Sequence, residues 1–198
     1  MPPRTVTHRE LARRLGALPP SCGPVRVVAV DGPSGAGKST FAPVLARALA
    51  GAPVVAADQF PVPWEGDPLA WWPPFAAQVL APLAAGRPGG YRPYDWQRDA
   101  YGARIEIPVV PVLIVEGVGA AWRECPAAYR IWLDAPRDVR RRRTIERDGP
   151  GVGPAWDRWS DRERAHFAAD RTRERADLRV DGAPAIPYDP EREFVTPP

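Results

Sequence analysis

The segment that most constrains the fold is residues 32–39, GPSGAGKS, which matches the pattern G-x-x-x-x-G-K-[ST]. A short β-branched run, Val25–Val30, precedes it, and an apolar helical pattern follows from Phe41. Together they predict a buried strand, a glycine loop and a helix. In this context the pattern indicates a phosphate-binding loop, because glycines allow successive amide N–H groups to point at phosphate oxygens.

The side chains of this loop suit a nucleoside triphosphate with Mg²⁺. Lys38 can bridge the β- and γ-phosphates, and the Ser39 hydroxyl can ligate the metal ion. Lys38 is the only lysine in the chain, since 27 basic residues less one lysine leave 27 − 1 = 26 arginines. Arginine is a poor replacement where a compact charge is needed. We predict ATP and Mg²⁺ as cofactors, with the nucleotide bound by Gly32, Ser34, Gly35, Ala36, Gly37, Lys38, Ser39 and Thr40.

Three further apolar runs, at residues 53–57, 112–115 and 129–133, alternate with helical segments. This alternation predicts an α/β fold with a doubly wound, mostly parallel sheet of about five strands flanked by helices. Ligands of such sheets bind at the carboxyl ends of the strands. We therefore expect the acids that follow these runs at the same edge as the loop: Asp58, Glu116 and Asp134.

The acids at the strand ends are assigned different roles. Glu116 follows VLIV, as the metal-side acid of a phosphate-loop NTPase does, and is predicted to lie near Mg²⁺. Asp58 is the candidate general base, with a helix cap or turn acid as the alternative. Asp134 precedes Ala-Pro and a helix, which favours capping, and Asp31 is expected to tether the loop.

A basic helix is predicted over residues 137–147, followed by a glycine-rich break. Helical spacing places Arg140, Arg143 (or Thr144) and Arg147 on one face. This face suits a short lid at residues 140–154 whose guanidinium groups neutralise the transferring phosphoryl group. A solvated charged face is the alternative. Nucleic-acid binding is disfavoured, because the basic helix carries no aromatic residue and a second basic element is missing.

The length of 198 residues predicts a single domain. Helices are also expected at residues 7–18, within an N-terminal extension of residues 1–20, and at 74–85 and 155–175, the last with Trp156, Trp159 and Phe167 in the core. His8 is expected to be exposed, and a proline-rich tail at residues 185–198 to be partly disordered. No apolar run reaches the length of a membrane span, and the N-terminus lacks a signal core, which predicts a cytoplasmic protein without a membrane partner.

The ordered set of motifs resembles the uridine kinase-like branch of the phosphate-loop kinases, in the nucleoside and nucleoside monophosphate kinase superfamily. The likeness covers about residues 25–182 and rests on VDGPSGAGKST, AADQF, GDP, YRPYDW, VLIVEGV, IWLDAPRDVRRRRTIERD and ADLRVDG. It implies that Asp58 is the catalytic base, that Tyr94 lies beside a nucleobase and that Glu116 lies near Mg²⁺. It also implies that the lid arginines Arg140, Arg143 and Arg147 surround the phosphates.

The chain departs from this family where the acceptor is recognised. The base-recognising histidine has no counterpart, and Gln97-Arg98-Asp99 stands in its region. The ribose-binding aspartate falls near Asp67. Trp64, Trp71 and Trp72 offer a substituted pocket, although core packing is the commoner use of such residues. The predicted substrate-binding residues are Asp58, Phe60, Asp67, Tyr94 and Arg98.

The hypothesis is ATP- and Mg²⁺-dependent phosphoryl transfer to a hydroxyl of a small nucleoside-like acceptor, with Asp58, Lys38, Arg143 and Arg147 as catalytic residues. Two alternatives stay open. One is a nucleotide-binding switch or partner-binding ATPase, in which the aromatic loop at residues 59–72 contacts a protein. The other is a kinase of a different small molecule, such as a nucleoside monophosphate or an antibiotic-like alcohol, for which Arg92 and Arg98 would suit an anionic group.

Overall fold

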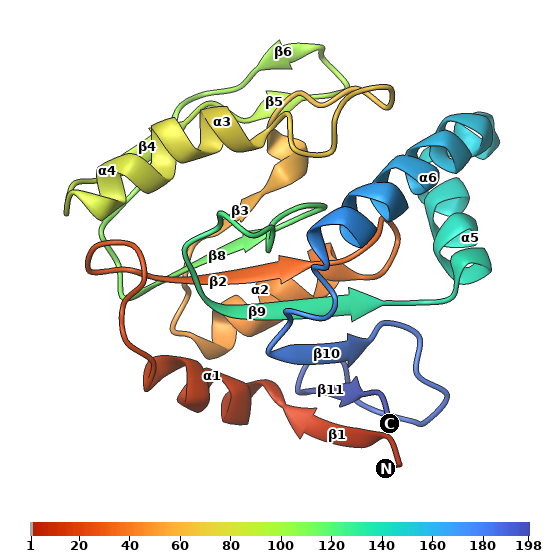
Figure 1. Ribbon diagram of the computed structural model, residues 1–198, viewed down its shortest axis with the longest axis horizontal. Helices are drawn as coiled ribbons and strands as arrows, with labels where there is room; N and C mark the ends of the chain where they lie inside the picture. The colour runs from red at the N-terminus through yellow and green to blue at the C-terminus, as the bar shows by residue number, and fades with distance from the viewer. Residues whose placement is uncertain (1) are drawn as a thin grey trace.

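The structure is a computed structural model that describes residues 2–198. Its centre is a seven-stranded sheet in the order β1-β11-β10-β9-β2-β8-β3 (Figure 1). The strands from β10 to β3 are parallel, whereas β11 pairs antiparallel with both β10 and β1. The strands are β1 (Arg4–Thr7), β2 (Arg26–Asp31), β3 (Val54–Ala56), β8 (Val112–Glu116), β9 (Ala127–Asp134), β10 (Leu178–Asp181) and β11 (Glu193–Thr196). The predicted mostly parallel α/β sheet is confirmed, and β11 and β1 extend it beyond the expected size.

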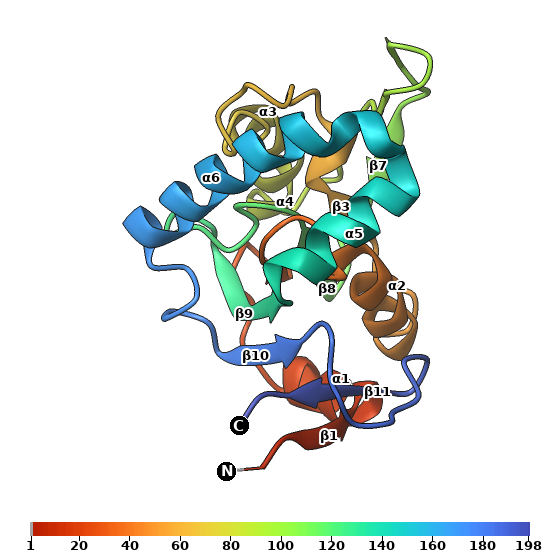
Figure 2. The same cartoon turned by 90° about the vertical axis from the view of Figure 1, so that its right-hand side faces the viewer.

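Helices cover both faces of the sheet, because its central strands are apolar on both sides (Figure 2). Val28 and Val30 of β2 pack in one cluster with α1 (His8–Gly16) and α2 (Lys38–Ala48). Val27 and Ala29 point the other way, toward the helical segment of α3 (Trp72–Phe75), a π turn (Ala76–Leu80) and α4 (Ala81–Ala84). The remaining helices, α5 (Arg137–Asp148) and α6 (Gly153–Asp170), extend from the ends of β9 and β10.

The predicted helix at residues 74–85 is present, but its middle is a π turn. The turn ends at Leu80, two residues before Pro82, which has no N–H to donate to a preceding carbonyl. Two small hairpins then connect α4 to β8. They pair β4 (Gly89–Tyr91) with β7 (Ile105–Ile107) and β5 (Tyr94–Asp95) with β6 (Ala100–Tyr101). The expected helix at residues 155–175 ends earlier, at Asp170, because Arg171 adopts a left-handed conformation with φ 55°.

The two ends of the chain differ from the sequence prediction. The tail, expected to be partly disordered, contains β11, which pairs with β1 beside the N-terminal helix. His8, expected to be exposed, is buried against Phe41 and Phe194 with ring centroids 5.1 and 5.3 Å away. The reason is tertiary: Phe194 completes the apolar layer under α1 and α2, which the local sequence does not reveal.

Replacing Phe194 by alanine is expected to destabilise the protein by about 3 to 5 kcal/mol, because a buried ring that also meets the ring of Phe41 edge to face is lost. Urea denaturation measures the change. Tyr188→Ala is the matched control, since Tyr188 lies in the same tail and is 37% exposed. Equal stabilities of the two variants would show that β11 adds nothing to the core.

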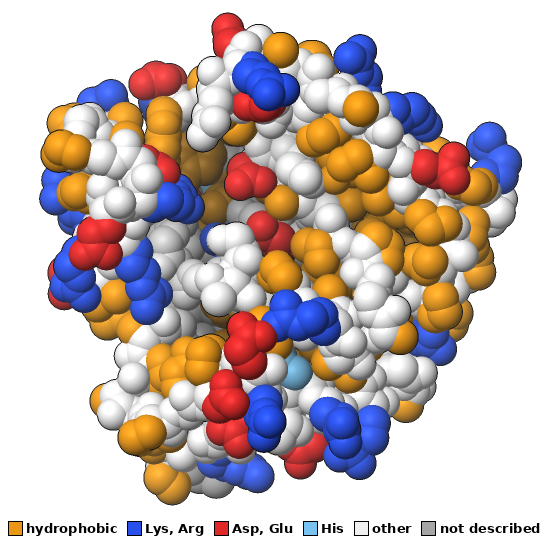
Figure 3. Space-filling model, turned by 180° about the vertical axis from the view of Figure 1, so that it is seen from behind, with side chains coloured by type: hydrophobic (Ala, Val, Ile, Leu, Met, Phe, Trp, Pro, Cys, Tyr) orange, Lys and Arg blue, Asp and Glu red, His pale blue; other side chains and the backbone are white. Residues whose placement is uncertain are grey.

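The surface carries both signs of charge. Acidic and basic side chains are interspersed over the face seen in Figure 3. A hollow with hydrophobic side chains in its depth and acidic ones near its rim opens on the same face. Among residues 2–198, no helix combines the length and the apolar character that crossing a membrane requires.

Candidate active site

A pocket of about 820 Å³ lies at the carboxyl ends of β2, β3 and β8. The phosphate loop after β2 lines one side, and Asp58 and Glu116, from the ends of β3 and β8, line another. Arg143 and Arg147 reach it from α5. Parallel sheets bind ligands at this edge, and Asp58 and Glu116 lie at the same edge as the loop, as the sequence predicts.

The phosphate loop is shaped to receive an anion. Its amide N–H groups at Gly35, Gly37, Lys38 and Ser39 have no hydrogen-bond acceptor within residues 2–198. Gly32 has φ +143°, and a Cβ there would lie 1.9 Å from the carbonyl oxygen of Leu133. Free amides at the start of α2 form an anion-binding nest, and this close approach explains why the first loop position requires glycine.

Lys38, the first residue of α2, is buried beneath this nest. Its Nζ donates hydrogen bonds to the carbonyl oxygens of Gly32 and Pro33, at 2.7 and 3.0 Å. The loop's own carbonyls therefore hold the ammonium group at the pocket, where it is available to a phosphate oxygen.

Asp31 tethers the loop, as the sequence predicts. Its Oδ1 accepts the N–H groups of Gly32 and Gly119 at 2.7 and 3.0 Å, and its Oδ2 accepts that of Ala121 at 2.8 Å. Burial raises the pKa of this fully buried carboxyl to about 6. Asp31 thus joins the phosphate loop to the segment that follows β8.

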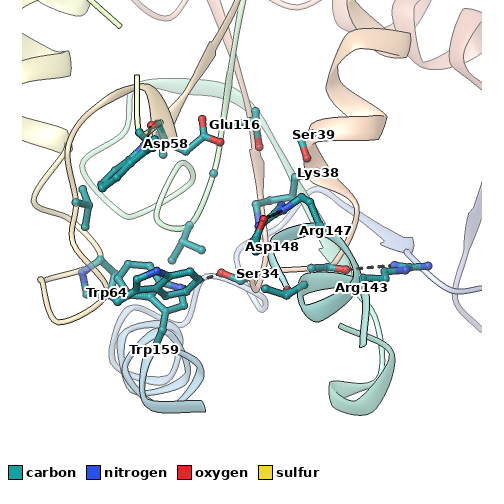
Figure 4. A pocket seen from close by; sticks show the side chains of 18 of the residues that line it. Ser34, Lys38, Ser39, Asp58, Trp64, Glu116, Arg143, Arg147, Asp148 and Trp159 are labelled. Carbon is teal, nitrogen blue, oxygen red and sulfur yellow. Dashed lines mark hydrogen bonds and ion pairs between the residues drawn. The ribbon is translucent and has the colours of Figure 1, made fainter. Parts of the chain in front are cut away.

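Asp58 and Glu116 lie on the same side of the pocket (Figure 4). Asp58 is exposed in the 3₁₀ turn Ala57–Gln59, whereas Glu116 is 6% exposed. Burial raises the pKa of Glu116 to about 7, and the charges of Asp58 and Asp31 add to this effect while Lys38 opposes it. A cation near Glu116 would offset this unfavourable charge. Asp134, by contrast, accepts the N–H of Ala135 and does not cap α5, whose N-cap is Pro136.

The three lid arginines have different surroundings. The guanidinium group of Arg140 is buried, and it donates to Ala135 O, Ser34 O and Glu163 Oε1 at 3.0, 3.2 and 3.0 Å. Arg143 donates to Gly35 O at 3.2 Å and to Gly182 O at 2.9 Å. Arg147 forms two 2.7 Å hydrogen bonds to Asp148, which raise its pKa. Arg143 and Arg147 line the pocket, whereas Arg140 does not and instead contacts the phosphate loop through Ser34 O.

Of the predicted acceptor contacts, the structure brings only Asp58 and Phe60 to the pocket wall. The hydroxyl of Tyr94 donates to Asp99, and the side chain of Arg98 is 84% exposed beside Asp95. Asp67 accepts the N–H of Leu69 at 2.8 Å. Asp67, Tyr94 and Arg98 thus lie outside the pocket lining, and their side chains contact neighbouring residues of the same loops instead.

Several lining or supporting residues were not predicted. Trp96, two residues after Tyr94, lines the pocket and donates from Nε1 to Asp58 O at 2.6 Å. On α6, Trp159 Nε1 donates to Ser34 Oγ at 2.8 Å, and Glu163 Oε2 accepts the Ser34 N–H at 2.9 Å. Trp156, Trp159 and Phe167 are buried as predicted, and Trp159 also lines the pocket. The only signal in the sequence for Trp96 was its place in the YDW motif.

Replacing Glu163 by glutamine is expected to destabilise the protein by about 3 kcal/mol, because Arg140 loses the partner of its buried charge. Thermal or urea denaturation measures the change. Glu174→Gln is the matched control, since Glu174 is exposed just beyond the same helix. A loss below about 0.5 kcal/mol, the usual scale of a surface substitution, would mean that the pair does not hold α5 and α6 to the loop.

No family model and no curated protein matches the chain. Solved structures do match it. A candidate uridine kinase from Bacillus stearothermophilus is 17% identical, with a TM-score of 0.62 over 87% of this chain and 96% of that one. A candidate fructose transport system kinase from Silicibacter sp. TM1040 is 21% identical, with a TM-score of 0.63 over 88% and 98%. The chain therefore has the fold of the phosphate-loop kinases.

Proposed function

We propose that the protein is an ATP- and Mg²⁺-dependent kinase that phosphorylates a hydroxyl of a small nucleoside-like acceptor. One observation carries the proposal: the Asp58 carboxylate lines the same pocket as the free amides of the phosphate loop and Lys38. A base facing a triphosphate site is the arrangement that phosphoryl transfer to an alcohol requires. The fold shared with phosphate-loop kinases supports it. From its sequence, we expect the protein to act in the cytoplasm, without a nucleic-acid or membrane partner.

In this reaction the acceptor oxygen attacks the γ-phosphorus, a new P–O bond forms, and the bond to the oxygen bridging the β- and γ-phosphates breaks. Asp58 takes the proton of the acceptor hydroxyl, and ADP leaves with the bridging oxygen. Lys38 and the loop amides stabilise the negative charge on the phosphate oxygens. Arg143 and Arg147 line the same pocket, where guanidinium groups can neutralise the transferring group.

The residues present fit a magnesium ion. Mg²⁺ prefers hard oxygen ligands and is commonly held by one or two carboxylates together with substrate phosphates. Ser39 and Glu116 line the pocket and supply a hydroxyl and a carboxylate, which are oxygen donors of this kind. When bound, the ion would neutralise charge on the β- and γ-phosphate oxygens.

The surroundings of the aromatic loop favour a kinase over a protein-binding switch. Phe60, Trp71 and Trp72 are all less than a tenth exposed, so they are not available to a protein partner. Phe60 and Trp71 instead line the pocket beside Asp58.

A coupled ADP-release assay tests the proposal against nucleosides, nucleoside monophosphates, sugars and small alcohols, with ATP and Mg²⁺ present. Release that depends on one class of acceptor supports a kinase. ADP release at one slow rate, indifferent to every acceptor, would contradict it and favour the switch.

A further inference from the structure

The pocket has two unlike sides. All its lining cations, Lys38, Arg143 and Arg147, stand with the phosphate loop or on α5. The opposite side, here called the aromatic wall, consists of Phe60, Val62, Trp64, Trp71, Val118 and Trp159. In Figure 4, Trp64 and Trp159 lie together, away from Lys38 and Ser39. The wall is continuous, because Val62 packs against the core cluster of Phe60 and Trp71 and also against that of Val118 and Trp159.

The aromatic wall has little hydrogen-bonding capacity left for a ligand. The indole N–H of Trp71 donates to Val118 O at 3.0 Å, and that of Trp159 donates to Ser34 Oγ at 2.8 Å. At the edge of the wall, Trp96 donates to Asp58 O. Of the wall's three indoles, only that of Trp64 has an N–H without an acceptor within residues 2–198. Any further hydroxyl buried against this surface loses its water and gains no side-chain partner, which costs about 1 to 3 kcal/mol for each group. A ligand rich in hydroxyl groups therefore fits this side poorly.

The wall also lacks a cation for an anionic ligand. Arg92 donates from Nε to Gly102 O, Arg98 is exposed beside Asp95, and neither lines the pocket. Apart from the three cations on the phosphate side, no lysine or arginine of residues 2–198 lines the pocket. Arg162, which donates to the backbone carbonyl of Trp64, does not line the pocket, whereas the carboxylate of Asp58 does and repels an anion. The phosphate group of a phosphorylated acceptor would thus have no cationic partner at the wall.

Trp64 is held where it can stack on a flat ligand. Its backbone carbonyl accepts a 2.7 Å hydrogen bond from Arg162 of α6. Its ring meets that of Trp159 edge to face, with centroids 6.0 Å apart. Stacked or edge-to-face aromatic contacts add about 0.5 to 1.5 kcal/mol beyond the burial of apolar area.

Building on the proposed kinase function, we infer that the acceptor is a non-anionic alcohol whose flat, largely apolar body packs on the aromatic wall and whose reacting hydroxyl meets Asp58. An aryl alcohol satisfies both conditions, and so does a nucleoside with few sugar hydroxyls. A sugar is too polar for the wall, and a nucleotide brings an anionic group that the wall does not pair.

Equilibrium binding to the full chain, saturated with a non-hydrolysable ATP analogue and Mg²⁺, tests this inference. The probes are 2-(2-naphthyl)ethanol, fructose, and the matched pair thymidine and thymidine 5′-monophosphate. We expect naphthylethanol to bind at least about 10-fold more tightly than fructose, and thymidine about 10-fold more tightly than its monophosphate, as one unpaired polar or charged group predicts. Trp64→Ala should weaken naphthylethanol binding about 5- to 10-fold, whereas the tail variant Tyr188→Ala should not.

Any of three results would overturn the inference. Fructose could bind as tightly as naphthylethanol, thymidine 5′-monophosphate could bind as tightly as thymidine, or Trp64→Ala could leave naphthylethanol binding unchanged. The kinase proposal is measured separately, as Lys38-dependent transfer of the γ-phosphoryl group. Phosphoryl transfer to fructose would support the kinase proposal and contradict the inference that the acceptor is largely apolar. If the probes bind with the expected preferences but no alcohol is phosphorylated, the inferred ligand class stands and the kinase proposal is wrong.

Discussion

Replacing Lys38 by alanine is expected to lower ATP-dependent phosphoryl transfer about 100- to 1,000-fold, the usual effect of removing one preorganised donor from a developing charge. The physical reason is that Lys38 is the only lysine in the chain and its Nζ is held by two loop carbonyls at the pocket. The neighbouring amides cannot replace it, because they would contact the phosphate oxygens from the other positions of the nest. Coupled ADP release at saturating ATP measures the loss.

Two further variants sharpen this test. Lys38→Arg should recover little activity, because a planar guanidinium does not occupy the buried position of a compact ammonium. Arg142→Ala, on the exposed side of α5, removes a positive charge without touching the pocket and should leave the rate unchanged. A Lys38→Ala variant that keeps more than about a tenth of the rate would remove Lys38 from the proposed catalytic role.

Replacing Asp58 by asparagine is expected to lower transfer about 100- to 10,000-fold, the range of general base catalysis, while ATP affinity changes little. Asparagine keeps the shape of the side chain but does not take a proton. The hydrogen bond from Trp96 goes to the backbone carbonyl of residue 58, so it should survive the substitution and hold the turn in place.

Steady-state kinetics and calorimetry of ATP binding together measure this effect. The loss should appear in kcat, because the base acts on the acceptor hydroxyl in the chemical step. Asp161→Asn is the control, since Asp161 is an exposed carboxylate on α6 outside the pocket. If Asp58→Asn turned over acceptor at the wild-type rate, Asp58 would be a turn residue, which was the alternative reading of the sequence.

Most of the parallel sheet and the phosphate loop could be predicted from sequence, because each rests on a short contiguous pattern. The run before Gly32, the glycine loop and the apolar helix after it lie within one stretch of chain, so local periodicity and residue type suffice. The strand-end rule then placed Asp58 and Glu116 at the same edge without any knowledge of distances. The β-strand of the tail escaped prediction because four residues, EFVT, do not establish a period.

The acceptor side of the pocket could not be predicted in the same way. Family-like spacing pointed to Asp67, Tyr94 and Arg98, yet their side chains are engaged locally outside the lining. Trp96 reaches the pocket instead, since the turn of the β5–β6 hairpin decides which neighbouring side chain meets Asp58. A sequence motif does not show which of two residues, two positions apart in a hairpin, has its side chain at the pocket.

The sequence by itself determined the chemistry of the phosphate side: one loop, one lysine and two acids whose order along the chain implies their place at the sheet edge. Only the tertiary structure decided that Arg140 is a buried brace, that Glu163 and Trp159 hold Ser34 from more than a hundred residues away, and that the remaining wall is aromatic. The physical reason is that these contacts join distant segments. Their formation depends on how α5 and α6 pack over the loop, and no local pattern of residues encodes that packing.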